Sequence, residues 1–429
     1  PPELPAALAK TLATAPEKVT DAKQREALMR FYLARIAQPV NDELAKRRLA
    51  WENARAEHSA ADLAIPGTFI FRDAETPRDT FIAMRGAYNK LGDKVEPTTP
   101  AAFHPLKKSG ARATRLDLAQ WLVAPENPMT ARVTVNRFWQ QVFGIGLVKT
   151  SHDFGSQGEP PSHPELLDDL AVRFQKGGWN VKQLIKQLMM TKAFKQASPV
   201  ESTLLSLDSE NRLLARGPRI RLDAEQIRDN ALFVSGLINL DIGGRGVRTY
   251  QPPNIWEPVG YGDSNTRYYL QDHGTSLYRR SLYSFLKRTA PPPFMSNFDA
   301  PNREQSCTRR ERSNTPMQAL QLMNDVQHFE AARALAERVI AEGGKDDVLK
   351  LNWLFRTVLS RKPDSKEFSM LTSALAKQRE LYQKDPKAAE KALHVGESTP
   401  KKIAAPAESA AWTLIANLVL NLDETVTRN

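Results

Sequence analysis

The stretch LDAEQIRDNALFVSGL, residues 222–237, shows how most of this chain is expected to fold. Its apolar side chains recur at the three- and four-residue intervals that gather them on one face of an α-helix. The same periodicity predicts further helices, at about 164–177, 179–194, 315–335, 348–359, 365–382 and 408–420. The sequence therefore predicts a mainly α fold, a multi-helix globular module with a small β element and long ordered loops.

The chain is expected to fall into three parts. Residues 1–60 are predicted to form a helical hairpin, broken where Pro39 interrupts the helical pattern. Residues 61–112 are predicted to form a short β element and an extended linker, and residues 113–429 the main helical domain. That domain contains an irregular loop region at 240–315, where glycines, prolines and aromatic residues replace the helical pattern.

Three short runs have the composition of β-strands. Two of them, 67–72 and 79–84, form the predicted β element, and the third, 281–286, lies inside the irregular region.

The composition describes a folded, basic protein. With 429 residues, 41% hydrophobic and 25% charged, the chain is long enough to bury a large core. Its net charge of +11 favours anionic partners such as acidic polysaccharide, nucleic acid or an acidic protein. Nucleic acid is the weakest of these expectations, because the sequence contains no known reader motif.

Several site classes are excluded by residue type. The single cysteine, Cys307, rules out an intrachain disulfide and a multi-cysteine metal site, and no cofactor motif is present. No apolar run approaches the roughly twenty residues of a transmembrane helix. The start Pro1-Pro2-Glu3 lacks an initiator methionine, so we expect the native N-terminus to lie upstream.

Imidazoles and carboxylates gather in one part of the sequence. Two histidines and several carboxylates there could converge as acid/base groups or as ligands of a metal whose identity stays open. The candidate catalytic residues are His152, Asp153, His163 and Asp168. The alternative is structural, because residues such as Asp153 and Ser162 are also typical of turns and helix caps.

The irregular region combines arginines with aromatic residues. Aromatic faces stack on sugars or bases, and guanidinium groups bind sulfate, carboxylate or phosphate oxygens. The candidate ligand-binding residues are Arg245, Tyr250, Trp256, Tyr261, Tyr268, Tyr269, Arg303, Arg309, Arg310 and Arg312. We expect them to face one solvent-reachable hollow, although loop aromatics also form small cores of their own.

Oppositely charged residues alternate between 219 and 229, which predicts a buried arginine–carboxylate network that joins parts of the fold. Arg221, Glu225 and Asp229 have the spacing of neighbours on one helical face.

From residue 115 to the C-terminus the chain closely resembles one family, the planctomycete-type domain of unknown function 1553. The motifs that carry the resemblance are RLDLAQWL (115–122), NPMTARV (127–133), VNRFWQ (135–140), PSHPELLD (161–168), RLDAEQIRD (221–229), YQPP (250–253), RRSLY (279–283), FDAPNRE (298–304), NTPMQAL (314–320) and NLDET (421–425). Together these motifs are highly specific.

The resemblance implies a setting but supplies no mechanism. Members of this family are usually large exported proteins of planctomycetes and related bacteria, often joined to an upstream cytochrome c-like module. An extracytoplasmic location, a partial chain and a possible contact with such a module are therefore expected, and no established catalytic residues carry over.

Three hypotheses about function remain. The first is a non-catalytic binding or scaffolding module of a larger exported protein, which engages an anionic polysaccharide or a partner protein. The second is a metal-assisted hydrolase that acts on a polysaccharide, and the third is nucleic-acid binding.

Overall fold

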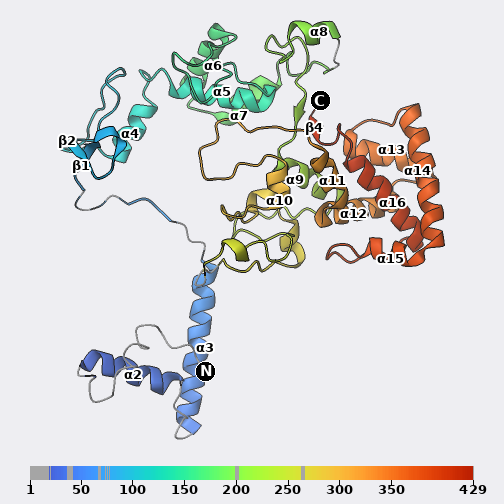
Figure 1. Ribbon diagram of the computed structural model, residues 1–429, viewed down its shortest axis with the longest axis horizontal. Helices are drawn as coiled ribbons and strands as arrows, with labels where there is room; N and C mark the ends of the chain where they lie inside the picture. The colour runs from blue at the N-terminus through green and yellow to red at the C-terminus, as the bar shows by residue number, and fades with distance from the viewer. Residues whose placement is uncertain are drawn as a thin grey trace. The chain divides into compact units, whose positions relative to one another are not determined.

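The computed structural model describes residues 19, 21–35, 42–65, 69–72, 74, 76, 78–198, 202–261 and 266–428. The chain divides into two compact units, Pro1–Pro77 and Arg78–Asn429. Helices dominate both, as Figure 1 shows, and the only sheets among the described residues have two strands each. The prediction of a mainly α fold with a small β element is confirmed.

The first unit contains two described helices. They are α2 (Ala22–Arg35) and α3 (Asp42–Ala64), and they occupy the two arms of the predicted hairpin. Asp42 and Glu43 begin α3, where negative charge interacts favourably with the positive end of the helix dipole. The parts of the predicted hairpin at residues 1–18 and 36–41, with the break at Pro39, lie outside the described residues.

The small β element opens the second unit and differs from the predicted one. Strand β1 (Thr80–Ala83) pairs antiparallel with β2 (Leu91–Val95), with Thr80 opposite Val95. Of the run predicted as a strand at 67–72, the structure describes residues 69–72, which are exposed and belong to none of the strands. The hairpin forms instead because Arg85 and Gly86 adopt positive φ angles of 53° and 74°, which turn the chain back on itself.

The first helical group of the second unit has its own core. It consists of α4 (Arg115–Leu122), α5 (Thr130–Phe143), α6 (Pro164–Lys176), α7 (Val181–Met189) and α8 (Ser202–Leu207). Val135, Trp139, Leu167 and Leu188 lie in one buried apolar cluster that joins α5, α6 and α7. Pro164 stands in the first turn of α6, as its sequence predicts, since a proline there costs no helical hydrogen bond.

The C-terminal helices enclose the largest apolar cluster. They are α12 (Val326–Glu342), α13 (Asp347–Leu359), α14 (Ser365–Lys384), α15 (Pro386–Leu393) and α16 (Pro406–Leu420), the orange-to-red group of Figure 1. Leu335, Leu351, Phe355 and Trp412 are fully buried in this cluster. The sequence did not predict α15, which begins at a proline after a short gap.

The helix predicted at 315–335 is in fact two helices. The first, α11 (Pro316–Asn324), ends at Asp325, whose extended backbone (φ −64°, ψ 131°) breaks the helical path. The Asp325 side chain then accepts a hydrogen bond from the backbone N–H of His328 and caps α12. The chain therefore bends at Asp325.

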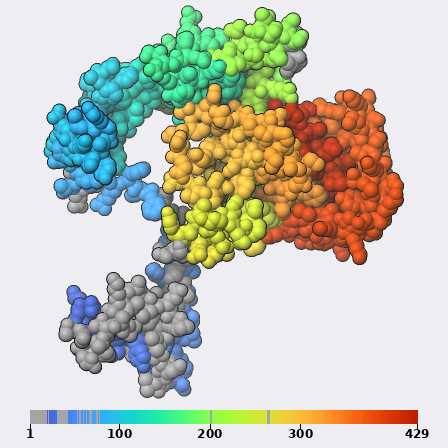
Figure 2. Space-filling model, in the orientation of Figure 1, coloured from blue at the N-terminus to red at the C-terminus, as the bar shows by residue number. Residues whose placement is uncertain are grey.

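Helix α9 (Ala224–Ser235) packs against α12 and leads into the irregular region. The irregular region contains the 3₁₀ turns η3 (Glu257–Val259), η4 (Gly274–Tyr278) and η5 (Ser281–Tyr283), and the short helix α10 (Pro293–Asn297). The yellow and orange surface of Figure 2 shows this region packed as a continuous mass.

The strand predicted at 281–286 does not form. Its first residues make η5, and its other backbone pairing is an isolated bridge between Val247 and Ser284. The N–H and hydroxyl of Ser281 donate instead to Asp229, which holds the segment against α9. A two-strand pairing of β3 (Ile220–Arg221) with β4 (Thr427–Arg428) lies just before α9.

Candidate functional site

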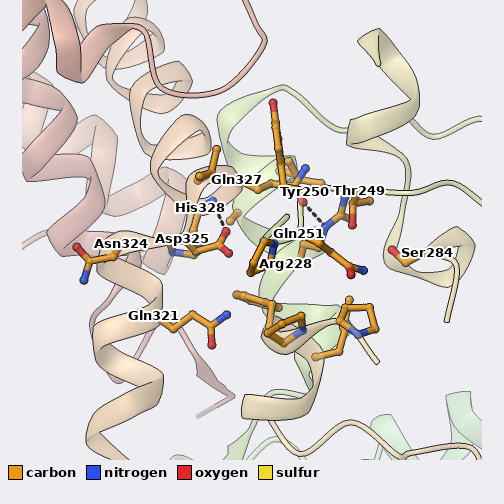
Figure 3. A pocket seen from close by; sticks show the side chains of 18 of the residues that line it. Arg228, Thr249, Tyr250, Gln251, Ser284, Gln321, Asn324, Asp325, Gln327 and His328 are labelled. Carbon is orange, nitrogen blue, oxygen red and sulfur yellow. Dashed lines mark hydrogen bonds between the residues drawn. The ribbon is translucent and has the colours of Figure 1, made fainter. Parts of the chain in front are cut away.

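A pocket of about 380 Å³ lies where α9 and the start of α12 meet the irregular region. Figure 3 shows it with Ser284 and Gln251 on one side and Gln321, Asn324 and Asp325 on the other. Its apolar lining includes the proline pairs at 252–253 and 292–293, together with Leu232, Phe294, Met295 and Val326. A mainly apolar wall with a few polar groups is typical of a small-molecule site.

Arg228 of α9 is a buried cation in the pocket wall. Its guanidinium donates to the carbonyl oxygens of Leu277 (2.7 Å) and Arg279 (2.8 Å), and to the side-chain oxygen of Gln327. Burial lowers its pKa to about 10, so it still carries its charge at neutral pH. The Asp229 carboxylate, 3.5 Å away, partly balances that charge.

The bend between α11 and α12 brings Asp325 and His328 to the opposite wall. The backbone N–H of His328 donates to the Asp325 carboxylate at 3.0 Å (Figure 3). Burial raises the pKa of Asp325 and lowers the pKa of His328 to about 4. The imidazole of His328 is therefore uncharged at neutral pH.

Three polar atoms around this pocket are buried without a hydrogen-bond partner among the described residues. They are Gln251 Oε1, Ser284 Oγ and His328 Nε2. Buried polar atoms in folded proteins are nearly always hydrogen-bonded, because an unpaired one costs about 1–3 kcal/mol. The Gln251, Ser284 and His328 side chains line the cavity, while these three atoms are themselves enclosed by the protein in this conformation.

A buried network holds Tyr250 at the edge of the pocket. Its hydroxyl accepts a hydrogen bond from the backbone N–H of Glu397 at 2.8 Å. The neighbouring Tyr278 hydroxyl donates to Glu330 at 2.8 Å, and burial raises the pKa of Tyr278 to about 12. Glu330 also accepts from the N–H of Ser398, which ties the segment before α16 to α12. The contact with Glu397 fixes the Tyr250 hydroxyl in place.

The structure gives the candidate catalytic residues separate local partners. Asp168 pairs with Arg132 at 2.7 Å, and the hydrogen bond from Arg132 lowers the pKa of Asp168. Asp153 accepts from the N–H of Gly155, and His163 stands at the N-cap of α6 beside Ser162, while His152 is exposed. Within the described part of the chain, no three His, Cys, Asp or Glu residues are grouped to hold a metal ion.

The candidate aromatic residues are spread over different environments. Trp256 is 1% exposed and packs against Tyr269, with 4.8 Å between the ring centroids. Tyr261 and Tyr268 lie on the surface. Of the five aromatic candidates, Tyr250 lines the pocket.

The candidate arginines are largely engaged with carboxylates. Arg310 donates to both oxygens of Glu225, at 2.6 and 3.1 Å, and Arg312 lies 3.5 Å from Asp223. Arg309 lies 3.7 Å from Glu311. Arg303 and Arg310 line a second pocket beside α9 and η5, and the backbone oxygen of Arg245 accepts a hydrogen bond from Arg279.

The charged residues at 219–229 do join parts of the fold. Their partners differ from the ones that their helical spacing predicts. Glu225 pairs with Arg310 rather than with Arg221, which donates to Gln318 and lies 3.4 Å from the Asp423 carboxylate. Sequence reasoning missed the pocket residues Gln251, Ser284, Asp325 and His328. Gln251 belongs to the YQPP motif, which is the one feature of the sequence that could have indicated the pocket. Ser284, Asp325 and His328 come together with Gln251 only in the tertiary fold.

The helices and the comparisons with known proteins bear on the chain as a whole. No described helix has the length and apolar character needed to cross a membrane. No curated protein and no solved structure matches the chain. The sequence model of one family, described as PSD1, protein of unknown function (DUF1553), matches residues 114–375, which is more than half of the chain. The match covers α4 to α13 and most of α14, and with them the whole pocket, so the chain belongs to the DUF1553 family.

Proposed function

We propose that this chain is a non-catalytic binding module for an uncharged carbohydrate, with the pocket of Gln251, Ser284 and His328 as its binding site. The observation that carries the proposal is a mainly apolar cavity whose lining includes the polar side chains of Gln251, Ser284 and His328. The cavity volume of 380 Å³ falls within the range of about 300–1,000 Å³ for small-molecule sites.

The chemistry of the unpartnered atoms favours hydroxyl groups on the ligand. Gln251 Oε1 can only accept a hydrogen bond, so the ligand must donate one. Ser284 Oγ can donate or accept, and neutral His328 Nε2 does one or the other according to its tautomer. Sugar hydroxyls both donate and accept, and therefore suit all three positions.

The apolar lining favours a ring. The proline pairs 252–253 and 292–293 and the ring of Phe294 offer flat, rigid faces. A sugar ring has an apolar face of C–H groups that packs on such surfaces, while its hydroxyls point outward to the polar atoms.

The balance of charge favours a neutral ligand over an anionic one. Arg228 is offset by Asp229 and Asp325, and the Asp325 carboxylate would repel an anion in the same pocket. The arginines expected to bind acidic groups already pair with carboxylates, as Arg310 does with Glu225. They therefore offer little uncompensated charge.

The extracytoplasmic setting implied by the family resemblance is part of this proposal, as is attachment to a larger exported protein. Carbohydrate on a cell surface or in the surroundings would be accessible from such a location. Fractionation of the producing cells, with the chain detected by antibody, tests the location independently of binding.

The direct test is calorimetry and ligand-observed NMR of the purified chain with glucose, xylose, mannose and their disaccharides. Glucuronic acid and sulfated glucose serve as anionic comparisons. Gln251→Ala and His328→Gln should each weaken binding about three- to tenfold, the value of one hydrogen bond. Gln383→Ala, an exposed change on α14, is the matched control. Absence of binding to every neutral sugar, or equal binding by the pocket variants, would refute the proposal.

A further inference from the structure

The second pocket, of about 960 Å³, is an open groove beside α9 and η5. Three of the motifs that carry the family resemblance meet in its lining, namely RLDAEQIRD (221–229), RRSLY (279–283) and FDAPNRE (298–304). Its volume reaches the upper end of the range of about 300–1,000 Å³ for small-molecule sites. The groove therefore has room for a segment of another macromolecule.

The groove changes in character along α9. Glu225 lies in the first turn of the helix, and Phe233 lies near its last turn. At about 1.5 Å per residue, these two positions are separated by about 12 Å along the helix axis. The groove therefore has a charged end and an apolar end that are about 12 Å apart.

Large side chains are exposed at the apolar end. Phe233 is 63% exposed, Leu240 58% and Leu282 73%, and all three line the groove. Exposed apolar side chains that gather around one hollow indicate a binding surface, whereas isolated ones are normal on a protein surface. This end of the groove is therefore suited to a large apolar side chain of a partner.

Arginines outnumber carboxylates at the charged end. Asp223 lies 3.7 Å from Arg310 and 3.5 Å from Arg312, and Glu225 accepts two hydrogen bonds from Arg310. Arg303 lines the groove without an ion pair to any described carboxylate, which makes it the exception among the candidate arginines. Burial alone would raise the pKa of Glu225, but the hydrogen bonds from Arg310 and the charges of Arg310 and Arg303 lower it. Arg303 can therefore interact with an anionic partner.

Arg280 adds positive charge beside the middle of α9. It lies 3.9 Å from Asp229, whose carboxylate also accepts two hydrogen bonds from Ser281 and lies 3.5 Å from Arg228. The Arg280 side chain is 49% exposed, so its guanidinium remains accessible from solvent. Because two arginines share one carboxylate here, charge complementarity again favours an acidic partner.

We propose that this groove binds an extended, acidic peptide segment of a partner protein, with a carboxylate near Arg280 and Arg303 and a large apolar side chain against Phe233. An extended peptide advances about 3.3 Å per residue, so these two side chains of the partner are about three or four residues apart. The carboxamide of Asn230, which forms no hydrogen bond within the described structure, offers the donor and acceptor that suit a peptide backbone. The proposal is independent of the sugar pocket.

Selection of random dodecapeptides displayed on phage, with the intact chain as bait, tests the partner chemistry. The enriched peptides should carry Asp or Glu three or four positions from Phe, Leu or Ile. Enriched peptides without a carboxylate, or no enrichment at all, would overturn the proposal. A heparin octasaccharide is the competing probe. Heparin binding that survives Phe233→Ala, without enrichment of any peptide, would assign the groove to a sulfated polysaccharide instead.

Fluorescence polarisation of a labelled enriched peptide then tests the two ends of the groove. Phe233→Ala should weaken binding about five- to thirtyfold, because a large apolar contact is lost. Arg303→Gln should weaken it about two- to fivefold, the range of an exposed ion pair. The effect of Arg303→Gln should vanish for a peptide with Asn or Gln in place of the carboxylate residues, because the two changes remove the same interaction.

Matched controls lie outside the lining of the groove. Arg309→Gln removes an exposed arginine that pairs with Glu311, and Leu207→Ala removes a leucine that is 83% exposed on α8. Both variants should bind the peptide as wild type does. Wild-type affinity in Phe233→Ala would overturn the proposal, as would an equal loss in Arg303→Gln for the acidic peptide and its amide analogue.

Discussion

Gly396 lies against the carboxylate of Glu330 so closely that a β-carbon at Gly396 would stand 2.2 Å from Glu330 Cδ. Gly396 also has a φ of +87°, which disfavours any side chain. The glycine therefore lets the segment before α16 reach the buried network of Glu330, Tyr278 and Ser398.

Gly396→Ala should lower the free energy of unfolding by about 2–3 kcal/mol, because overpacking adds to the backbone strain. Gly178→Ala is the matched control, since Gly178 has a φ of +69° but nothing within 4 Å of the added carbon. Urea unfolding of both variants measures the difference. Equal losses would show that backbone strain alone explains the effect.

Burial of His328 predicts a loss of stability in mild acid. Its folded pKa of about 4 lies below the value of 6.5 expected in the unfolded chain, so the unfolded state binds more protons between these values. Stability should fall as the pH drops from about 6.5 toward 4, by up to about 3 kcal/mol from this residue.

The comparison of wild type with His328→Gln isolates this contribution. The raised pKa of Asp325 acts in the opposite sense, since it favours folding as the carboxylate takes up its proton at lower pH. Urea unfolding across this pH range should show a flatter profile for His328→Gln than for wild type. The exposed control Gln383→Ala should keep the wild-type slope, and the same slope in the His328 variant would contradict the prediction.

Ser284→Ala should separate stability from binding. Because Ser284 Oγ has no partner within the described structure, its removal should leave the free energy of unfolding unchanged or raise it by up to about 1 kcal/mol. Sugar binding should weaken about three- to tenfold, since Ser284 lines the proposed binding pocket. If Ser284 only supported the fold, Ser284→Ala would lower the free energy of unfolding and leave sugar binding unchanged.

Arg379 should contribute more to stability than an ordinary surface arginine. It donates to both carboxylate oxygens of Asp347 and of Glu408, and so connects α14 with α13 and α16. Arg379→Met should lower the free energy of unfolding by about 1–3 kcal/mol, because two carboxylates lose their partner. Arg173→Met breaks an exposed pair with Asp169 and should cost less than about 0.5 kcal/mol. Thermal or urea unfolding that ranks the two variants equally would contradict this.

Local signals in the sequence predicted most of the helices. The proline at 164 and the apolar periodicity of 222–237 identified α6 and α9, because both signals act within one or two helical turns. The break at Asp325 was missed although Asn324-Asp325 is a plausible helix cap, since the apolar pattern continues across it.

The pocket could not be derived from the sequence in the same way. Its lining brings together α9, the segment at 249–253, Ser284 and the start of α12, and no local pattern relates these four. The aromatic content of 240–315 did indicate ordered loops. Which rings would be buried, as Trp256 is, and which exposed, as Tyr261 is, depends on packing partners far away in the sequence.

The pairing of Arg221 with Thr427 has a consequence for biosynthesis. Helices α9 to α16 lie between these two residues in the sequence, and closing so long a loop is entropically slow compared with forming the helices within it. On the ribosome, the strand that leads into α9 must wait for its partner to emerge. Nascent chains arrested before Thr427 should therefore lack this pairing. Protease protection of the α9 region should appear only after Thr427 has been synthesised.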